Sequence, residues 1–366
     1  MPGLPHYDNL QSRLLLGPLF RNQWFIPNPP PSWIARALRL YERRVLHVLT
    51  EGIRIDRPIF IISLPRSGSS LLQNILCAHP DAAFTTHAMH VGRTCLCGIE
   101  SVRQRLRLNV RGERFLADSV DIDAGSPADP VAIWSEWLRV DPYDPLRRDQ
   151  AAFVADDLSA RECETIREGI RRVLWCFNPQ TSRFICKNPA LLPHIRVLNG
   201  LFPDARFVFL VRDARMNANS MLKLRRLCCE QLDAIRRRTG RDPSGGRGLV
   251  PYPWLPNLPR YLRDFGPDDI RTPAHLWDDS IRFMDEVRGE LGAVLDVRYE
   301  DLLAAPRDQL GRILDFCELP PVPASHAPFR DRVASVGVVR HANPQYGQAD
   351  LIASICRDTL ISRGYS

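Results

Sequence analysis

The sequence predicts an α/β fold in which a parallel sheet is flanked by helices. The evidence is a pair of segments, residues 57–78 and 206–222, in which a short apolar run leads through a polar loop into a helical pattern. Apolar runs of this length, rich in Ile, Val and Phe, are typical of strands that are buried on both faces. Because strands that alternate with helices pair in parallel through right-handed crossovers, these two units predict a parallel sheet.

An irregular arm over residues 1–31 comes first, and a basic amphipathic helix follows it from Ser32 to about Leu49. The apolar side chains of this helix share one face, which we expect to pack on the core. Its arginines leave open a peripheral contact with a membrane. The apolar side chains on the shared face are Ile34, Leu38, Tyr41, Val45 and Leu49.

Three further strands are expected, at 82–86, 183–187 and 294–299. The predicted organisation is an N-terminal arm and helix over 1–56, an α/β core over 57–325, and a C-terminal segment over 326–366 that packs on the core. The core carries insertions at about 100–180 and 225–273. We expect the first insertion to be mostly helical and the insertions to form a cap.

Composition indicates an ordinary globular enzyme. The chain has 366 residues, of which 25% are charged and 45% hydrophobic, and a formal net charge of +7. Residues 222–247 hold eight basic and three acidic side chains. This stretch is either a solvated face or a rim beside a polyanionic cofactor. Because no stacking aromatic residues are interleaved with these charges, a nucleic-acid partner is not expected.

The cysteines, the first residues and the apolar runs indicate in which cellular compartment the protein is expected. None of the ten cysteines forms a pair with the two-residue spacing of zinc or redox sites, and a chain this long does not need a disulfide framework. No signal peptide and no run of eighteen apolar residues is visible. These features favour a cytoplasmic location.

The loop at residues 65–70, which reads Pro-Arg-Ser-Gly-Ser-Ser, is the strongest functional signal. It would direct backbone N–H groups, hydroxyl groups and one guanidinium to a single point, where the positive end of the next helix dipole also lies. This arrangement predicts a site for an anion of phosphate size. The residues concerned are Arg66, Ser67, Gly68, Ser69 and Ser70.

A second anion-binding pair follows the other buried strand. Arg212 ends the apolar run 206–211, and Ser220 lies eight residues later in a helical pattern. Arg offers a forked donor that is always charged, and Ser adds a hydroxyl group. The phosphate loop of nucleoside triphosphatases, with two glycines followed by Lys and Ser or Thr, does not occur at 65–70.

Together these motifs resemble those of sulfotransferases that use 3′-phosphoadenosine 5′-phosphosulfate. The likeness extends to the Ala-His-Pro-Asp turn at 78–81 and to segments at 184–189, 201–206 and 297–302, as in tyrosylprotein and bacterial sulfotransferases. It covers about residues 58–320 and implies a P-loop-like fold. It also implies that the 65–70 loop binds the 5′-phosphosulfate and that Arg212 and Ser220 bind the 3′-phosphate.

The same resemblance implies the catalytic residues. Lys187 ends a predicted strand and would assist Arg66 in stabilising charge on the sulfuryl group, while Arg340 is a further candidate cofactor contact. His87 has the spacing from Arg66 at which tyrosylprotein sulfotransferases carry a catalytic Glu. Since small-molecule sulfotransferases use a His base, His87 is the candidate general base and His90 its rival. The departure from Glu puts a peptide-tyrosine acceptor in doubt.

The sequence therefore predicts an enzyme that transfers a sulfuryl group from 3′-phosphoadenosine 5′-phosphosulfate to a hydroxyl or amine of a small molecule, lipid or carbohydrate. No metal is expected, because positive side chains and N–H groups can replace Mg²⁺ for this less charged group. Two alternatives stay open, a nucleotide kinase or triphosphatase and a non-catalytic nucleotide-binding relative. The acceptor and the oligomeric state are not predicted.

Overall fold

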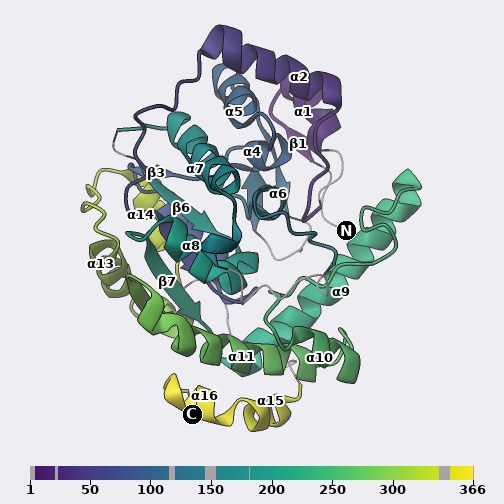
Figure 1. Cartoon of the computed structure of the whole chain (residues 1–366), viewed down its shortest axis with the longest axis vertical. Helices are drawn as coiled ribbons and strands as arrows, with labels where there is room; N and C mark the ends of the chain where they lie inside the picture. Colours follow the sequence, from purple (N-terminus) through teal and green to yellow (C-terminus); the bar gives the residue numbers. More distant parts are fainter. Residues whose placement is uncertain are drawn as a thin grey trace. The chain divides into compact units, whose positions relative to one another are not determined.

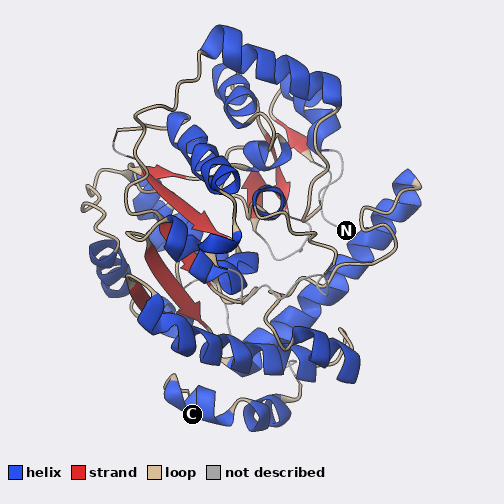
Figure 2. Ribbon diagram, in the orientation of Figure 1, coloured by secondary structure: helices blue, strands red, loops and turns tan. Residues whose placement is uncertain are grey.

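A five-stranded sheet with the predicted strands is present in the computed structural model, which describes residues 5–20, 24–114, 120–144, 154–180, 182–337 and 347–365 (Figure 1). The strands are β2 (Ile59–Ile62), β3 (Ala82–Ala83), β6 (Arg183–Lys187), β7 (Arg206–Val211) and β8 (Val294–Arg298). Their order is β3-β6-β2-β7-β8, and the pairs β2–β7, β7–β8 and β3–β6 are parallel. The predicted α/β class is confirmed (Figure 2).

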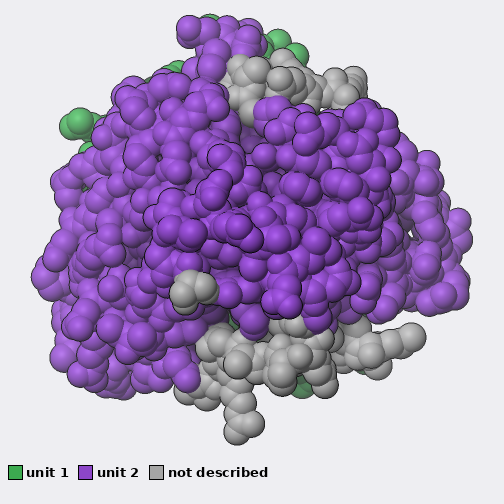
Figure 3. Space-filling model, turned by 90° about the horizontal axis from the view of Figure 1, so that it is seen from below, with its two compact units in different colours: residues 1–56, 80–140, 160–186 green, residues 57–79, 141–159, 187–366 purple. Residues whose placement is uncertain are grey.

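The chain divides into two compact units that interleave along the sequence. Figure 3 colours unit 1 green and unit 2 purple. Unit 1 comprises Met1–Asp56, Pro80–Val140 and Ala160–Cys186. Unit 2 comprises Arg57–His79, Asp141–Ser159 and Lys187–Ser366.

In unit 2, strands β2, β7 and β8 lie side by side in a fixed register. Ile59 is opposite Arg206, and Phe207 is opposite Val294. Strand β2 is fully buried, and Phe60 stacks on Phe207 with the ring centroids 5.8 Å apart. The apolar runs of β2 and β7 therefore form strands because both of their faces are covered, whereas β8 ends the strand order and is mostly half-buried.

A helix follows each of these strands and starts close to its carboxyl end. The helices are α3 (Ser69–Leu76), α9 (Ala214–Thr239) and α12 (Tyr299–Ala304). Helix α11 (Arg271–Val287) packs on α9, as does α15 (Ala349–Ile355) (Figure 1). In parallel α/β sheets, ligands bind beyond the carboxyl ends of the strands, where these helices begin.

The remaining elements of unit 2 are mostly short helices. They are η2 (Ala155–Asp157), η3 (Pro189–His194), α8 (Ile195–Leu201), α10 (Leu258–Asp264), η4 (Arg288–Glu290), α13 (Pro306–Phe316), α14 (Ala327–Ala334) and α16 (Arg357–Ser362).

Unit 1 contains a small antiparallel sheet that the sequence did not predict. Its strands are β1 (His6–Tyr7), β4 (Val110–Glu113) and β5 (Asp121–Asp123), in the order β1-β4-β5. The expectation of a mostly helical segment over 100–180 was incomplete, because β4 and β5 are short, polar and half-exposed and give no apolar pattern. The helices of this unit are α1 (Leu10–Phe20), α2 (Ser32–Tyr41), η1 (Glu42–Leu46), α4 (His87–Val91), α5 (Leu96–Arg105), α6 (Val131–Trp137) and α7 (Ala160–Trp175).

The arm expected to be irregular over 1–31 instead contains β1 and α1, because tertiary packing orders it, and three predicted elements are shorter than expected. The helix expected to reach Leu49 keeps its α-helical form only to Tyr41, continues as the π-helical turn η1, and ends at His47 with a φ of 46°. The change of period turns Val45 outward, and Leu49 lies beyond the end of the helix; both are exposed, so their assignment to the packed face was wrong. The strand expected at 82–86 is confined to Ala82–Ala83, and the strand expected at 294–299 ends at Arg298 because Tyr299 begins α12.

Candidate functional site

The loop between β2 and α3 has a backbone that ordinary residues avoid. Arg66 has a φ of 70° and Gly68 a φ of 86°. Only glycine fits at residue 68, because a Cβ atom there would overlap the ring of Tyr299, the first residue of α12. Left-handed backbone at a non-glycine residue costs free energy and persists where surrounding contacts fix it, often at functional sites.

The start of helix α3 provides backbone donors beside this loop. Gly68 is its N-cap, and the amides of Leu71 and Leu72 donate to the Gly68 carbonyl at 3.0 and 3.3 Å. The first N–H groups of a helix have no partner within the helix itself, and they carry the positive end of its dipole. The loop and the first turn of α3 together favour an anion.

Three predicted cofactor residues are in contact with one another. The Nε of Arg66 donates to the Oγ of Ser220 at 3.1 Å, and the Nη1 of Arg212 donates to the Arg66 carbonyl at 3.0 Å. Ser220 is buried, while both arginines are half-buried. Residues that are far apart in the sequence therefore meet at the carboxyl ends of β2 and β7 and concentrate positive charge there.

The position of Arg212 is fixed from two sides. Its guanidinium lies over the ring of Tyr299, 5.1 Å from the ring centroid, and its carbonyl accepts a hydrogen bond from the Nε1 of Trp277 at 2.9 Å. Burial raises the pKa of Tyr299, so the ring stays a neutral phenol that stacks on the cation.

Asn217 is a further member of this site that the sequence pattern did not indicate. It is buried on α9, and its Nδ2 donates to the carbonyl of Pro65 and to the Oγ of Ser67, at 3.0 Å each. It therefore ties the loop to the helix that carries Ser220. The sequence feature that could have indicated Asn217 is its position three residues before Ser220, on the same face of that helix.

Lys187 lies at the end of β6 with a side chain that is almost fully buried. Its Nζ donates to the Oγ of Ser70, at a distance of 3.1 Å. A buried ammonium group needs polar or anionic partners, because burial disfavours the charged form. This lysine thus contacts the same loop as Asn217 does.

The two candidate bases belong to unit 1 and differ in their surroundings. His87 is the first residue of α4 and is half-buried. His90 is buried, and its Nε2 accepts a hydrogen bond from the amide of Ala132 at 3.1 Å. Burial lowers the pKa of His90 well below its usual value, and the charges of His87 and Arg93 add to this effect. His90 is therefore a neutral residue with a structural partner.

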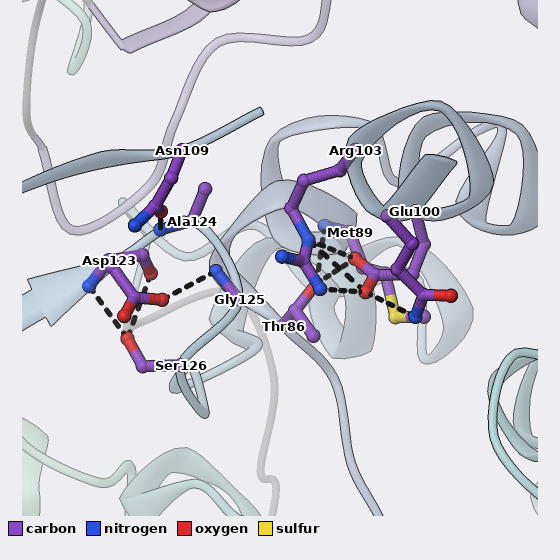
Figure 4. Close-up of polar contacts among 10 residues, drawn as sticks. Thr86, Met89, Glu100, Arg103, Asn109, Asp123, Ala124, Gly125 and Ser126 are labelled. Carbon is purple, nitrogen blue, oxygen red and sulfur yellow. Dashed lines mark hydrogen bonds and ion pairs between the residues drawn. The ribbon is translucent and has the colours of Figure 1, made fainter. Parts of the chain in front are cut away.

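A polar network supports the start of α4 (Figure 4). Thr86 caps the helix by accepting the amide of Met89 at 3.2 Å, and its hydroxyl donates to the buried carboxylate of Glu100 at 2.8 Å. Arg103 pairs with the same carboxylate. In a turn that Figure 4 also shows, the Oγ of Ser126 accepts the amide of Asp123 at 2.8 Å.

That turn holds the backbone of α4 directly. The amide of His87 donates to the carbonyl of Ser126 at 3.1 Å, and the amide of Ala88 donates to the carbonyl of Ala124 at 2.9 Å. The sequence pattern did not indicate this support, because Glu100 and Arg103 have the composition of an ordinary solvated helix face.

Arg340 lies outside the described residues. Within the described parts of the chain, no group of three or more His, Cys, Asp or Glu side chains is arranged to hold a metal ion. Among the same residues, no helix combines the length and the hydropathy needed to cross a bilayer.

Comparison with known proteins relates most of the chain to one family. The model of the sulfotransferase family matches residues 58–240 and 257–323. Omega-hydroxy-beta-dihydromenaquinone-9 sulfotransferase Stf3 from Mycobacterium tuberculosis is 25% identical over 336 residues, which span 85% of this chain and 78% of that protein. Protein-tyrosine sulfotransferase A from Caenorhabditis elegans is 22% identical over 264 residues, 72% of this chain and 50% of that protein.

Solved structures share the fold. Sulfotransferase STF9 from Mycobacterium avium superposes with a TM-score of 0.57 at 16% identity, covering 90% of this chain and 82% of its own. Sulfotransferase STF1 from Mycobacterium tuberculosis H37Rv gives a TM-score of 0.51 at 15% identity, covering 89% and 82%.

Proposed function

Because this chain belongs to the sulfotransferase family, we propose that it transfers a sulfuryl group from 3′-phosphoadenosine 5′-phosphosulfate to a hydroxyl or amine of a small molecule, lipid or carbohydrate. The observation that carries the proposal is the contact of Arg66 with both Ser220 and Arg212 beside the start of α3. It joins the two anion-binding motifs into one positively charged site.

The donor set suits a nucleotide that carries two separate anionic groups. The loop and the first turn of α3 offer hydroxyl and N–H donors for the 5′-phosphosulfate, and Arg66 and Lys187 add positive charge. Arg212 and Ser220 offer a forked cation and a hydroxyl for the 3′-phosphate. A single phosphate would leave one of these two donor sets unused.

Each residue has a defined chemical task in this proposal. The cofactor supplies an activated sulfuryl group on a phosphate leaving group. Arg66 and Lys187 stabilise the negative charge that develops on oxygen as the bond to sulfur breaks, since fixed cations need no reorganisation. Ser70 orients the Lys187 ammonium toward the loop. His87 takes the proton of the acceptor hydroxyl.

Among the three acceptor classes, a lipid alcohol is the first to test. The mycobacterial relative, whose name describes a menaquinone with a terminal hydroxyl group, aligns with 78% of its own length. The protein-tyrosine relative aligns with only half of its length. A hydroxyl acceptor also needs a base, and an imidazole can act as one near neutral pH.

Calorimetric titration tests the cofactor assignment. The protein should bind 3′-phosphoadenosine 5′-phosphate at least about tenfold more tightly than adenosine 5′-phosphate, since a charge-assisted contact contributes roughly 1.5–3 kcal/mol. Arg212→Ala should remove most of this difference. Arg215→Ala is the matched control, because the Arg215 guanidinium is paired with Asp213. Equal affinity of the wild type for both nucleotides, or Mg²⁺-dependent preference for ATP, would contradict the proposal.

A further inference from the structure

The first helices of unit 1 leave an unusual surface open to solvent. Seven of the ten large hydrophobic side chains that are exposed among the described residues lie between residues 10 and 49. They are Leu10, Leu14, Leu15, Trp33, Leu40, Val45 and Leu49. Scattered exposed hydrophobic residues need no explanation, whereas a contiguous patch of them marks an interaction surface.

These helices are anchored by their other faces. Leu16 of α1 and Leu38 of α2 pack on one apolar cluster that also contains Ile99 of α5. Helix α1 thus lies near α2, as Figure 1 also shows. Because their inner faces are already occupied, the outward side chains have no core position to take.

The outer face of α2 combines apolar and basic side chains. At 100° per residue, Trp33 and Leu40 point to the same side of the helix, with Arg36 beside them. Arg43 and Arg44 follow in η1. We name these five residues the α2 face; all are exposed, and Trp33 has 71% of its surface accessible.

The charge of the segment from residue 10 to residue 50 is one-sided, and the next acidic residue is the exposed Glu51. Between residues 10 and 50 the sequence contains one acidic residue, Glu42. Glu42 is buried, and its carboxylate accepts the amide of Gly98 at 2.8 Å and pairs with Arg172 at 3.2 Å. The arginines of the α2 face are thus not offset by an exposed carboxylate in the same stretch.

We propose that the α2 face docks on the surface of an anionic lipid bilayer. Trp33 and Leu40 would enter the boundary between head groups and acyl chains, and Arg36, Arg43 and Arg44 would contact lipid phosphates. The exposed apolar side chains match the acyl-chain region of a bilayer, and the interleaved arginines match its anionic head groups. Trp is favoured at the boundary between these two regions. The proposal does not depend on the proposed sulfuryl transfer.

The basic stretch of α9 provides the contrast. Arg237 and Arg238 are exposed there, but none of the large exposed hydrophobic residues among the described ones lies in α9. Charge alone gives a weak and salt-sensitive attraction, whereas the α2 face adds apolar burial.

Vesicle flotation of the full chain tests the proposal. The protein should float with vesicles that contain phosphatidylglycerol and much less with pure phosphatidylcholine, and added salt should weaken the binding. Trp33→Ala with Leu40→Ala should lower binding at least about tenfold. Arg36→Gln with Arg44→Gln should do the same, since each basic residue near an anionic surface contributes roughly a fivefold effect.

Two double variants are the matched controls. Leu351→Ala with Ile361→Ala removes exposed apolar side chains of unit 2, and Arg237→Gln with Arg238→Gln removes exposed arginines of α9. Both should float as the wild type does. Absence of binding to anionic vesicles, or an equal loss in either control, would overturn the proposal.

Two further measurements do not depend on the alanine variants. A lipid that is spin-labelled near its head group should quench the tryptophan fluorescence of the wild type more than that of Trp33→Phe. Equal quenching of the two proteins would count against docking. Sedimentation velocity measures whether the α2 face joins two copies of this chain. We expect the wild type and Trp33→Phe to sediment alike. If the wild type forms a dimer that Trp33→Phe does not form, and neither binds vesicles, the proposal fails. Nucleotide titration of the same variants reports the proposed function separately.

Discussion

Tyr299 couples the two halves of the candidate anion site through a single ring. One part of the ring lies against Gly68, where no side chain would fit, and Arg212 lies over it. The loop that follows β2 and the arginine that follows β7 are thus positioned by the first residue after β8. A change at any of these three positions should therefore affect the other two.

Gly68→Ala should both destabilise the fold and weaken nucleotide binding. Left-handed backbone costs an L-residue about 1–2 kcal/mol, and the new methyl group must also displace Tyr299. Gly266→Ala is the matched control, because Gly266 has a φ of 82° with no atom near its missing side chain. Denaturant unfolding should show a larger loss for Gly68→Ala, and calorimetry should show weaker nucleotide binding only for that variant. Equal losses in both variants would mean that the tyrosine contact is unimportant.

His87→Ala should lower turnover by about 10²–10⁴-fold while nucleotide affinity stays nearly unchanged, because a base acts on the acceptor and not on the cofactor phosphates. His90→Gln should leave turnover close to wild type, since the His90 Nε2 already accepts the amide of Ala132. If His90→Gln were the inactive variant, the base would be His90.

At the scale of elements, helix α4 shows what a sequence pattern cannot reveal. Five residues are too few for a stable helix by themselves, and its start is held by the cap of Thr86 and the buried Glu100–Arg103 pair. Glu100 and Arg103 are three residues apart on a polar-looking helix, so their spacing alone indicates an exposed ion pair. Burial of the carboxylate is decided by tertiary packing.

His90 should make stability depend on pH. Its pKa is lowered in the folded chain, whereas the unfolded chain takes up the proton near the usual value of 6.5. The contribution of neutral His90 to the free energy of unfolding is therefore fully present above about pH 6.5. It is lost as the pH falls toward the folded pKa, by at most about 1.4 kcal/mol per pH unit. Thermal melts should show a smaller acid-side loss for His90→Gln than for the wild type. His47→Gln, at an exposed histidine of the same unit, should show the same acid-side loss of melting temperature as the wild type.

Element boundaries were predicted best where burial is complete. The runs at 183–187 and 206–211 were predicted to the residue, because each has an apolar centre and charged residues at its ends or next to them. Strands β4 and β5 were missed, because a short strand at the surface carries no such pattern. The outward turn of Val45 was missed because a π-helical turn breaks the 3.6-residue period.

For the whole molecule, topology explains why the sequence could indicate the site. Residues at the carboxyl ends of neighbouring parallel strands are brought together by the sheet, so the order of strands and loops along the chain is enough to associate Arg66 with Arg212. Asn217 and Tyr299 could not be associated with them in this way, because their roles depend on a close approach of α9 and α12 to the loop. The roles of all these residues in catalysis stay predictions.

Activity should persist in excess EDTA, because the site concentrates fixed positive charge that can take the place of a cation. Arg66 and Arg212 meet at the loop, and Lys187 donates to Ser70 of the same loop. If these groups stabilise the developing charge, Lys187→Met should lower turnover by about 10²–10³-fold, as removal of one preorganised donor does, and added Mg²⁺ should not restore it. Lys187→Arg tests charge separately from shape and should retain more activity than Lys187→Met. A complete loss of activity in EDTA that Mg²⁺ reverses would instead favour the nucleotide kinase alternative, in which the metal and not the lysine neutralises the transferred group.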